Sequence, residues 1–406
     1  MKKIFTLFMV LALLLTACGT NTGGTSAPAE NAVELAQGVY EDKIVVGTTG
    51  AQQGPLAAIG KPYFDGMKAY FNTYNDNGGI DGKKIELMIL EDEFKPENAI
   101  ANVQKLINDE QVFTLVGLFG TPGVKASIPT VQEAGIPAVY FATGATAPTK
   151  AGDNFFPVQP NYWYEGKLMS KYIVDYFKAT KVAVIYRSDD VGLDGLAGLK
   201  DGFKVQGKEA LLVAELSVDA GSTDYTAQVA KVKESGADLL VMYGLTGEVS
   251  GTIKEMEKVG MTDIPIICPY PNVADSFIAS NKEAAPNVIQ NLHGMGWVDM
   301  TRPAVGDLEA AMNKYFPDSP MNAYTVSGWV AAETFVKGLE KVKEKFGMDQ
   351  LTWENYIAAM EELEYTEGII PKIAYALGER QGVMNMAVCK VEGDTWATMT
   401  DYLDFK

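Results

Sequence analysis

The sequence of 406 residues contains one histidine and three cysteines. A single histidine, His293, excludes a metal site with two histidine ligands, and neither a C-x-x-C nor an H-E-x-x-H spacing is present. A hydrolase of the Ser-His-Asp or Cys-His type would need His293 as its base. That residue stands among apolar residues and glycines in the stretch NLHGMGW. We therefore expect a structural role for His293, no metal site and no enzymatic activity.

The scarcity of cysteine limits covalent cross-linking. Cys268 and Cys389 could form one disulfide, but a chain of this length can bury a large core without one. Cysteine is also among the most buried residue types when its thiol is free. We expect two free, buried thiols, and a disulfide between them is the alternative.

Positive charge is in deficit: 34 lysines and arginines stand against 52 aspartates and glutamates, which gives a formal net charge of −18. Nucleic acids and anionic lipid surfaces are themselves negatively charged, so an acidic protein of this kind disfavours them as partners. The excess charge favours solubility, and we expect no nucleic-acid partner.

One long apolar run, from Ile4 to Leu15, follows two lysines at the N-terminus. The run is too short for a permanent bilayer span and is typical of a signal-peptide core. It ends in Leu15-Thr16-Ala17-Cys18, which resembles the lipobox of bacterial lipoproteins. This predicts a signal peptide over residues 1–17 and lipid attachment at Cys18. An ordinary signal peptide that ends near a cysteine is the alternative.

The residues after Cys18 are small and polar, with proline and glycine among them (GTNTGGTSAPAE). Such a composition is typical of a flexible linker. We predict a lipidated tether over residues 18–41, which would hold the folded part to the extracytoplasmic face of the cell membrane, in the periplasm or at the cell surface.

From residue 42 onward, short apolar runs alternate with segments of helical periodicity. KIVVGT at 43–48 predicts a strand, and apolar residues at helical spacing follow it. The same alternation restarts after Pro157, with KVAVIY at 181–186 as the next clear strand. Strands alternating with helices indicate parallel sheets covered on both faces. The sequence therefore predicts an α/β protein with two Rossmann-like lobes.

Several stretches, taken in order, resemble one known family. They are GPLAAIG (54–60), NDNGGIDGKKIEL (75–87), EDEFKPENA (91–99), VGLFGTPGV (116–124) and GADLLVMYG (236–244). Their order and spacing are similar to those of the branched-chain amino acid-binding family, the substrate-binding lipoproteins of ABC importers with a type I periplasmic-binding-protein fold. The resemblance covers most of residues 42–300 and is weaker toward the C-terminus.

The resemblance implies two lobes joined by a three-crossover hinge, with the ligand between them. Lobe one would hold residues 42–160 and about 293–375, and lobe two residues 161–292 and about 376–406. It implies a monomer without cofactors that captures a small amphipathic solute, such as an amino acid or a related carboxylate or amide. A membrane permease and its ATPase would be its partners. A ligand sensor that presents its closed form to a signalling partner is the alternative, since one fold serves both roles.

In parallel sheets, ligands bind beyond the carboxyl ends of the strands. After the strand at 113–117, Gly120 permits a close approach of the backbone, and Thr121 is expected to cap a helix that begins at Pro122. Such a helix end would aim unpaired N–H groups at a ligand carboxylate. Thr121 acting only as a helix cap is the alternative.

The other candidate site residues come partly from strand ends and partly from the family. Ala142, Thr143 and Gly144 follow the strand at 137–141, and the family implies that this loop contacts the ligand carboxylate. In lobe two, Leu245, Thr246 and Tyr270 follow strands, while Tyr164 and Tyr324 fall near family positions that face the cleft. Aromatic side chains there would cover an apolar part of the ligand, or would belong to the ordinary core.

One departure from the family concerns the ligand's ammonium group. Tyr270 stands where amino acid binders place an acidic residue. A buried ammonium without a partner is costly, so a zwitterion would need Asp189 or Asp190 as a substitute acid. Branched-chain amino acids and a small acid or amide with an apolar body both remain candidate ligands.

Overall fold

The computed structural model describes residues 33–375 and 380–405 of the chain. The predicted signal peptide and Cys18 lie outside the described residues. Residues Leu35–Lys406 form one compact unit. In the part of the chain that the structure describes, no helix combines the length and the apolar character needed to cross a bilayer.

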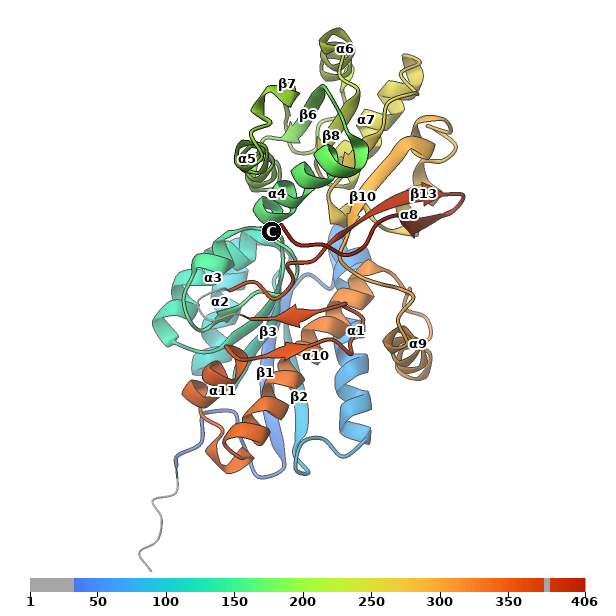
Figure 1. The fold of residues 1–406 in the computed structure, drawn as a ribbon. Coiled ribbons are helices and arrows are strands. Elements are labelled where there is room, and N and C mark those ends of the chain that lie inside the picture. Colours follow the sequence, from blue (N-terminus) through green and yellow to red (C-terminus); the bar gives the residue numbers. More distant parts are fainter. Residues whose placement is uncertain (1–32, 376–379, 406) are drawn as a thin grey trace, which may run out of the picture. The chain divides into compact units, whose positions relative to one another are not determined.

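Lobe one is built on a five-stranded parallel sheet in the order β2-β1-β3-β4-β5. Figure 1 labels β1, β2 and β3 of this sheet. The strands are β1 (Lys43–Gly50), β2 (Lys84–Glu91), β3 (Thr114–Phe119), β4 (Ala138–Ala142) and β5 (Phe155–Phe156). The helices are α1 (Ala57–Asp76), α2 (Pro96–Asn108), α3 (Thr121–Ala134), α9 (Ala304–Tyr315), α10 (Ala323–Lys345) and α11 (Trp353–Met360).

The two faces of this sheet carry separate apolar clusters, because successive residues of a strand point to opposite faces. Val45 of β1 packs in the cluster that α2 and α3 cover. Its neighbours Ile44 and Val46 pack with residues of α1 and α10. The predicted sheet with helices on both faces is thereby confirmed for lobe one.

Lobe two is built on a seven-stranded sheet in the order β14-β13-β10-β9-β8-β6-β7. The strands are β6 (Val182–Arg187), β7 (Leu212–Val218), β8 (Leu239–Tyr243), β9 (Ile266–Cys268), β10 (Leu292–Gly296), β13 (Ala387–Glu392) and β14 (Thr395–Thr398). The helices are α4 (Tyr162–Tyr172), α5 (Asp190–Val205), α6 (Thr226–Ser235), α7 (Thr246–Lys258) and α8 (Asp275–Asn281). Only β13 and β14 run antiparallel to their neighbours within this sheet.

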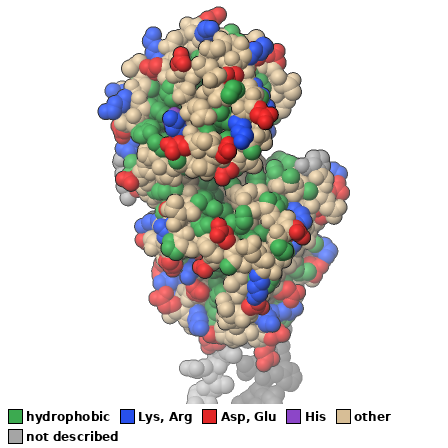
Figure 2. Space-filling view, turned by 90° about the vertical axis from the view of Figure 1, so that its right-hand side faces the viewer, with side chains coloured by type: hydrophobic (Ala, Val, Ile, Leu, Met, Phe, Trp, Pro, Cys, Tyr) green, Lys and Arg blue, Asp and Glu red, His purple; other side chains and the backbone are tan. Residues whose placement is uncertain are grey.

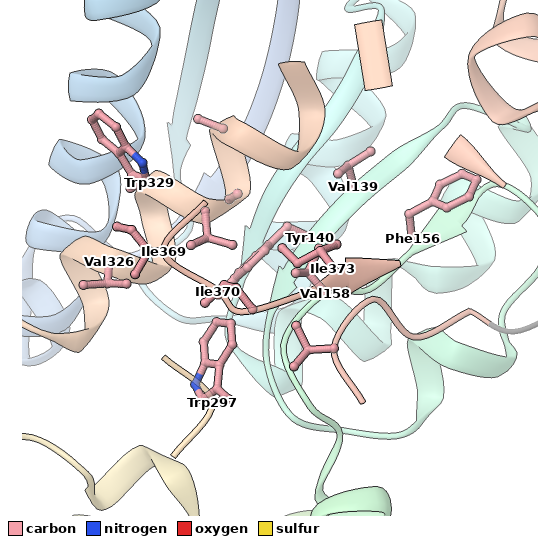
Figure 3. Close-up of a cluster of buried hydrophobic side chains, with 14 of the residues drawn as sticks. Val139, Tyr140, Phe156, Val158, Trp297, Val326, Trp329, Ile369, Ile370 and Ile373 are labelled. Atoms are coloured by element: carbon pink, nitrogen blue, oxygen red, sulfur yellow. The ribbon is translucent and has the colours of Figure 1, made fainter. Parts of the chain in front are cut away.

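The described chain passes between the lobes at three places: between β5 and α4, between β10 and α9, and before β13. The first and third passages are hydrogen-bonded to each other, since Gly382 N–H donates to Pro157 O and Val383 N–H to Val158 O, both at 2.9 Å. Trp297 and Val158 from the passages meet an apolar cluster that also contains Ile370 and Ile373 (Figure 3). The hinge is thus an apolar junction of several separate segments. A short pair of strands, β11 (Glu364–Tyr365) and β12 (Ile373–Ala374), precedes the third passage.

Two predicted boundaries are corrected. The compact unit begins at Leu35, so the flexible tether does not extend to residue 41. Gln37 fixes this stretch by donating from its side chain to Ile107 O at 3.1 Å and Val112 O at 3.0 Å. In lobe two, β10 continues to Gly296, a few residues beyond the predicted boundary at 292.

Cys268 and Cys389 are both free and buried, as expected. Each lies opposite the same residue of β10, because Gly294 pairs with Cys268 on one side and with Cys389 on the other. Neighbouring strands are about 4.8 Å apart, so the two cysteine Cα atoms are about 10 Å apart. A disulfide needs Cα atoms within about 7 Å, which excludes the pairing in this fold.

Candidate functional site

The candidate site begins where β3 and β4 end side by side. Phe119 and Ala142 are in register at the ends of these strands, and Gly120 N–H donates to Ala142 O at 3.2 Å. The hydroxyl oxygens of Thr121 and Thr143 consequently lie only 2.6 Å apart. The structure therefore brings together the two lobe-one loops that the sequence singles out. Figure 2 shows a hollow in the surface between the two lobes, with hydrophobic side chains around it.

Helix α3 begins one residue earlier than expected. Gly120 is its N-cap residue, with φ of +87°, and Thr121 is the first helical residue. The expectation that Thr121 caps the helix is therefore wrong, and its side chain is turned to Thr143 instead. A side chain at Gly120 would also meet the Phe94 ring, since an added Cβ would lie 2.3 Å from a ring carbon. The N–H groups of the first helical turn lack partners within the helix, which suits an anion.

Aromatic residues form a wall beside these loops. The Tyr162 and Tyr270 rings are stacked with centroids 5.9 Å apart and an angle of 20°, and Trp297 meets Tyr270 edge-on at 6.1 Å. Tyr162 N–H donates to Gly144 O at 2.7 Å, and a Cβ at Gly144 would lie 2.4 Å from the Tyr162 ring. The loop that carries Thr143 and Gly144 is therefore packed directly on this wall.

Two other predicted aromatics differ in their surroundings. Burial raises the pKa of the Tyr162 hydroxyl most, and Glu165 raises it further. Tyr324, at the start of α10, is close enough to Tyr162 to add a smaller increase. Burial raises the pKa of Tyr324 itself. Tyr164 contacts the C-terminal segment, since its hydroxyl donates to Met384 O at 2.8 Å and accepts from Phe405 N–H at 2.9 Å. The structure thus brings Tyr324 to the wall and Tyr164 to the C-terminal segment.

The loop after β8 adjoins the turn that contains Tyr270, because the Asn272 side chain donates to Gly244 O at 2.9 Å. Leu245 is the N-cap residue of α7, and its N–H donates to the Glu248 carboxylate at 3.1 Å. Thr246 is the first residue of α7 and is exposed. Leu245 and Thr246 thus begin a helix beside the wall, as Thr121 does on the other lobe.

A buried acid lies behind the wall and escapes sequence reasoning. Glu165 on α4 has no exposed surface. Its Oε1 accepts from Tyr270 N–H at 2.7 Å, and its Oε2 lies 2.5 Å from the Tyr243 hydroxyl. Burial raises the pKa of Glu165 to about 8, although the hydrogen bond from Tyr270 N–H acts to lower it. The sequence offers no signal for this, because Glu165 stands among tyrosines whose burial depends on three-dimensional packing.

The two acids considered as ammonium partners are already engaged. Asp189 caps α5 by accepting from Val191 N–H at 3.2 Å and pairs with Arg187 at 2.8 Å. Asp190 pairs with Lys125 of α3 at 2.6 Å. Neither carboxylate is left without a partner, and the second of these pairs joins the two lobes.

Other hydrogen bonds also cross between the lobes. Asp194 of α5 is bonded by Thr146 of lobe one, and Gln159 in the first passage joins Tyr140 of lobe one to Tyr270 of lobe two. In the described ranges there is no group of three or more His, Cys, Asp or Glu side chains that could hold a metal ion.

A model of the periplasmic binding protein family matches residues 43–395. The chain belongs to the periplasmic binding protein family. This confirms the resemblance drawn from the sequence, and relatives named as Leu/Ile/Val-binding proteins support it further.

Two relatives illustrate the similarity within the family. An amino acid binding protein of Pseudomonas aeruginosa is 30% identical over 54% of this chain and 58% of its own length. The aligned part therefore spans little more than half of that relative. The Leu/Ile/Val-binding protein homolog 3 of Brucella melitensis is 26% identical over 76% of this chain and 82% of its own length.

Solved structures share the fold at lower identity. A branched-chain amino acid ABC transporter protein from Thermus thermophilus with bound valine has a TM-score of 0.76 and 17% identity, and covers 90% of this chain and 98% of its own. A solute-binding protein from R. palustris in complex with 4-hydroxybenzoate has a TM-score of 0.74 and 19% identity, over 89% and 97%. These likenesses establish the type I periplasmic-binding-protein fold, which hosts different ligands, so the ligand must be argued from the site.

Proposed function

We propose that this protein is the extracytoplasmic substrate-binding lipoprotein of an ABC importer. It captures a small carboxylate or amide with an apolar body between its lobes and delivers it to a membrane permease with its ATPase. One observation carries the ligand proposal: the hydroxyl of Thr121, at the start of α3, is paired with that of Thr143, after β4, and the pair lies beside the Tyr162–Tyr270 stack. A polar oxygen-binding end thus adjoins an apolar, aromatic surface.

The polar end suits an oxygen anion for two reasons. The first turn of α3 offers N–H groups without helical partners and the positive end of the helix dipole. The hydroxyl pair of Thr121 and Thr143 adds one further donor, since one of the two hydrogens is used in their shared contact and the other is left for a ligand. Hydrogen bonds from such groups to a charged oxygen are among the stronger ones in proteins.

The aromatic end suits an apolar body better than an ammonium group. Asp189 and Asp190 are paired elsewhere, and Glu165 is buried behind Tyr270. None of these three carboxylates is free to pair with an ammonium at this wall, and an ammonium without a partner there would bear a desolvation cost. Branched-chain amino acids are the alternative ligands, and the experiment below compares them with acids that lack an ammonium group.

The experiment is isothermal titration calorimetry with valine, leucine, the leucine 2-keto analogue 4-methyl-2-oxopentanoate, and benzoate. We expect binding of the two acids that lack an ammonium group and weak binding of the two amino acids. Tight binding of valine or leucine, with none of either analogue, would contradict the ligand class and leave the transport role standing. A transport assay with the permease and ATPase in vesicles, in which no solute enters, would contradict the importer role.

A further inference from the structure

The hydroxyl group of Tyr243 has two close oxygen neighbours but only one hydrogen to donate. It lies 2.8 Å from the backbone oxygen of Tyr162 and 2.5 Å from Oε2 of Glu165. Both distances are those of hydrogen bonds. A backbone carbonyl can only accept, so the contact with Tyr162 takes the single hydrogen of Tyr243.

The contact between Tyr243 and Glu165 then requires a second hydrogen, and only the carboxyl group can supply it. The geometry points to Glu165 as a protonated, uncharged acid. Its Oε2 donates to the Tyr243 hydroxyl, and its Oε1 accepts from Tyr270 N–H. In this state Glu165 keeps the lobe-two wall of the binding site free of negative charge. This inference rests on the proposed function, because it specifies which ligand charge that wall accepts. Glu165 is a positioning residue here, since it acts through Tyr243 and Tyr270.

The surroundings of Glu165 agree with an uncharged state. The titratable groups that face it are Tyr162 on its own helix, Tyr243 on β8, Cys268 on β9 and Tyr270 in the turn after β9. Each is neutral in its ordinary form, and burial raises the pKa of all four. Among the described residues no cation faces Glu165, so an ionised Glu165 would be a buried charge without a counter-ion there, which is strongly disfavoured.

Ionisation of Glu165 would change the wall in two ways. The hydrogen of Tyr243 would turn toward the carboxylate, and the Tyr162 carbonyl would lose it. A negative charge would also arise directly behind Tyr270, which would repel a ligand carboxylate and attract an ammonium. The sign of the pH effect on affinity therefore reports the class of ligand.

The first test needs no ligand. Infrared spectroscopy of the wild-type protein should show the carbonyl band of a protonated carboxyl group at pH 6, and a part of that band should vanish as the pH rises through about 8. Glu165→Gln should lack that part, because its amide can donate to Tyr243 and accept from Tyr270 in the same way. Glu333→Gln is the matched control. Glu333 is a second buried acid, on α10, and burial raises its pKa to about 7. Its replacement should remove a different part of the carbonyl band. A wild-type band that does not change above pH 7.5, or a Glu165→Gln band identical to it, would overturn the inference.

The second test measures benzoate affinity by calorimetry between pH 6 and pH 9, a range in which benzoate itself does not titrate. If only the protonated form binds well, affinity should fall about tenfold across this range in the wild type and in Glu333→Gln. Affinity should stay constant in Glu165→Gln. A flat wild-type profile, or affinity that rises with pH, would overturn the inference. Absence of benzoate binding at every pH would instead count against the proposed ligand class, and the infrared result would still decide the state of Glu165.

Discussion

Asp194 of lobe two accepts two hydrogen bonds from Thr146 of lobe one, from its backbone N–H at 3.1 Å and from its hydroxyl at 2.8 Å. The pair of Lys125 on α3 and Asp190 on α5 joins the same two lobes. These contacts lie on α5 and on the loops and helix that carry Thr121 and Thr143. These contacts between the lobes therefore converge on one helix, α5, beside the loops of the proposed ligand site.

Asp194→Ala should weaken closure. A hydrogen bond to a charged group contributes about 1.5–3 kcal/mol, so the loss of both bonds should lower ligand affinity by more than about tenfold. Small-angle scattering should show a larger radius of gyration for the ligand-free variant than for the wild type. Asp201→Ala removes an acid of the same helix that pairs with Lys167 within lobe two, and it should leave both quantities unchanged. A radius equal to that of the wild type would argue against this contact as a closure element.

Thr121→Ala should reduce ligand affinity. Its hydroxyl forms one half of the pair with Thr143, and a bond to a ligand carboxylate would contribute about 1.5–3 kcal/mol, or tenfold or more in the dissociation constant. Calorimetry with the best-binding probe measures the effect. Thr395→Ala, on β14 of lobe two, is the control and should bind normally. Equal affinity of Thr121→Ala and the wild type would limit this threonine to a structural role.

Gly144→Ala should disturb the aromatic wall. The added methyl group would lie 2.4 Å from the Tyr162 ring, so the ring or the loop must move. Overpacking of this kind costs about 1–3 kcal/mol of unfolding free energy, and affinity should fall with it. Gly306→Ala meets nothing within 4 Å and lies in α9, so it should stabilise the protein by about 0.5–1 kcal/mol. Urea denaturation of both variants measures the change in unfolding free energy relative to the wild type. Changes of the same sign in the two variants would contradict this prediction.

His293 should make the folded state sensitive to acid. Burial lowers the pKa of His293 to about 4, whereas the unfolded chain has the ordinary value near 6.5. Between pH 6.5 and pH 4, His293 is protonated in the unfolded state but neutral in the folded state. The free energy of unfolding therefore decreases as the pH falls from 6.5 toward 4. The loss should approach about 3 kcal/mol. His293→Gln should show a smaller loss over this range in urea denaturation, and an identical slope would contradict the assignment.

Cys18→Ser should release the protein from the membrane. The prediction depends on the sequence motif alone, since Cys18 lies outside the described residues. Stable anchoring takes more than one acyl chain, and the lipobox cysteine is the attachment point that the resemblance implies. Cell fractionation should find the variant in the soluble extracytoplasmic fraction. Continued membrane association would show that another feature holds the protein there.

The sequence predicts that the two lobe-one loops lie side by side, because strand ends in a parallel sheet lie at one edge. Knowing that β3 and β4 are neighbours is enough to place Thr121 beside Thr143. The one-residue error at the start of α3 arises because Gly120 combines a positive φ with the capping position, which a threonine-proline pattern does not reveal.

The lobe-two half depends on packing that periodicity does not encode. Tyr162 follows a crossing between the lobes, and its partner Tyr270 is far away in sequence. Strand β10 also has a weak sequence signal, because LHGMG contains two glycines, which strands disfavour. The fold requires those glycines: a Cβ at Gly294 would lie 2.4 Å from Val273, and one at Gly296 would lie 2.5 Å from the Cys389 sulfur.

Strand β10 also separates the two buried thiols, one on each side of Gly294. Outside the cytoplasm, where the proposed function places this protein, oxidants would readily join two thiols that could meet. Cys268 and Cys389 can meet only in a chain whose β10 has not yet inserted between β9 and β13. A disulfide between Cys268 and Cys389 would therefore form only in misfolded chains. Its yield would measure how often β13 assembles next to β9 before β10 has inserted.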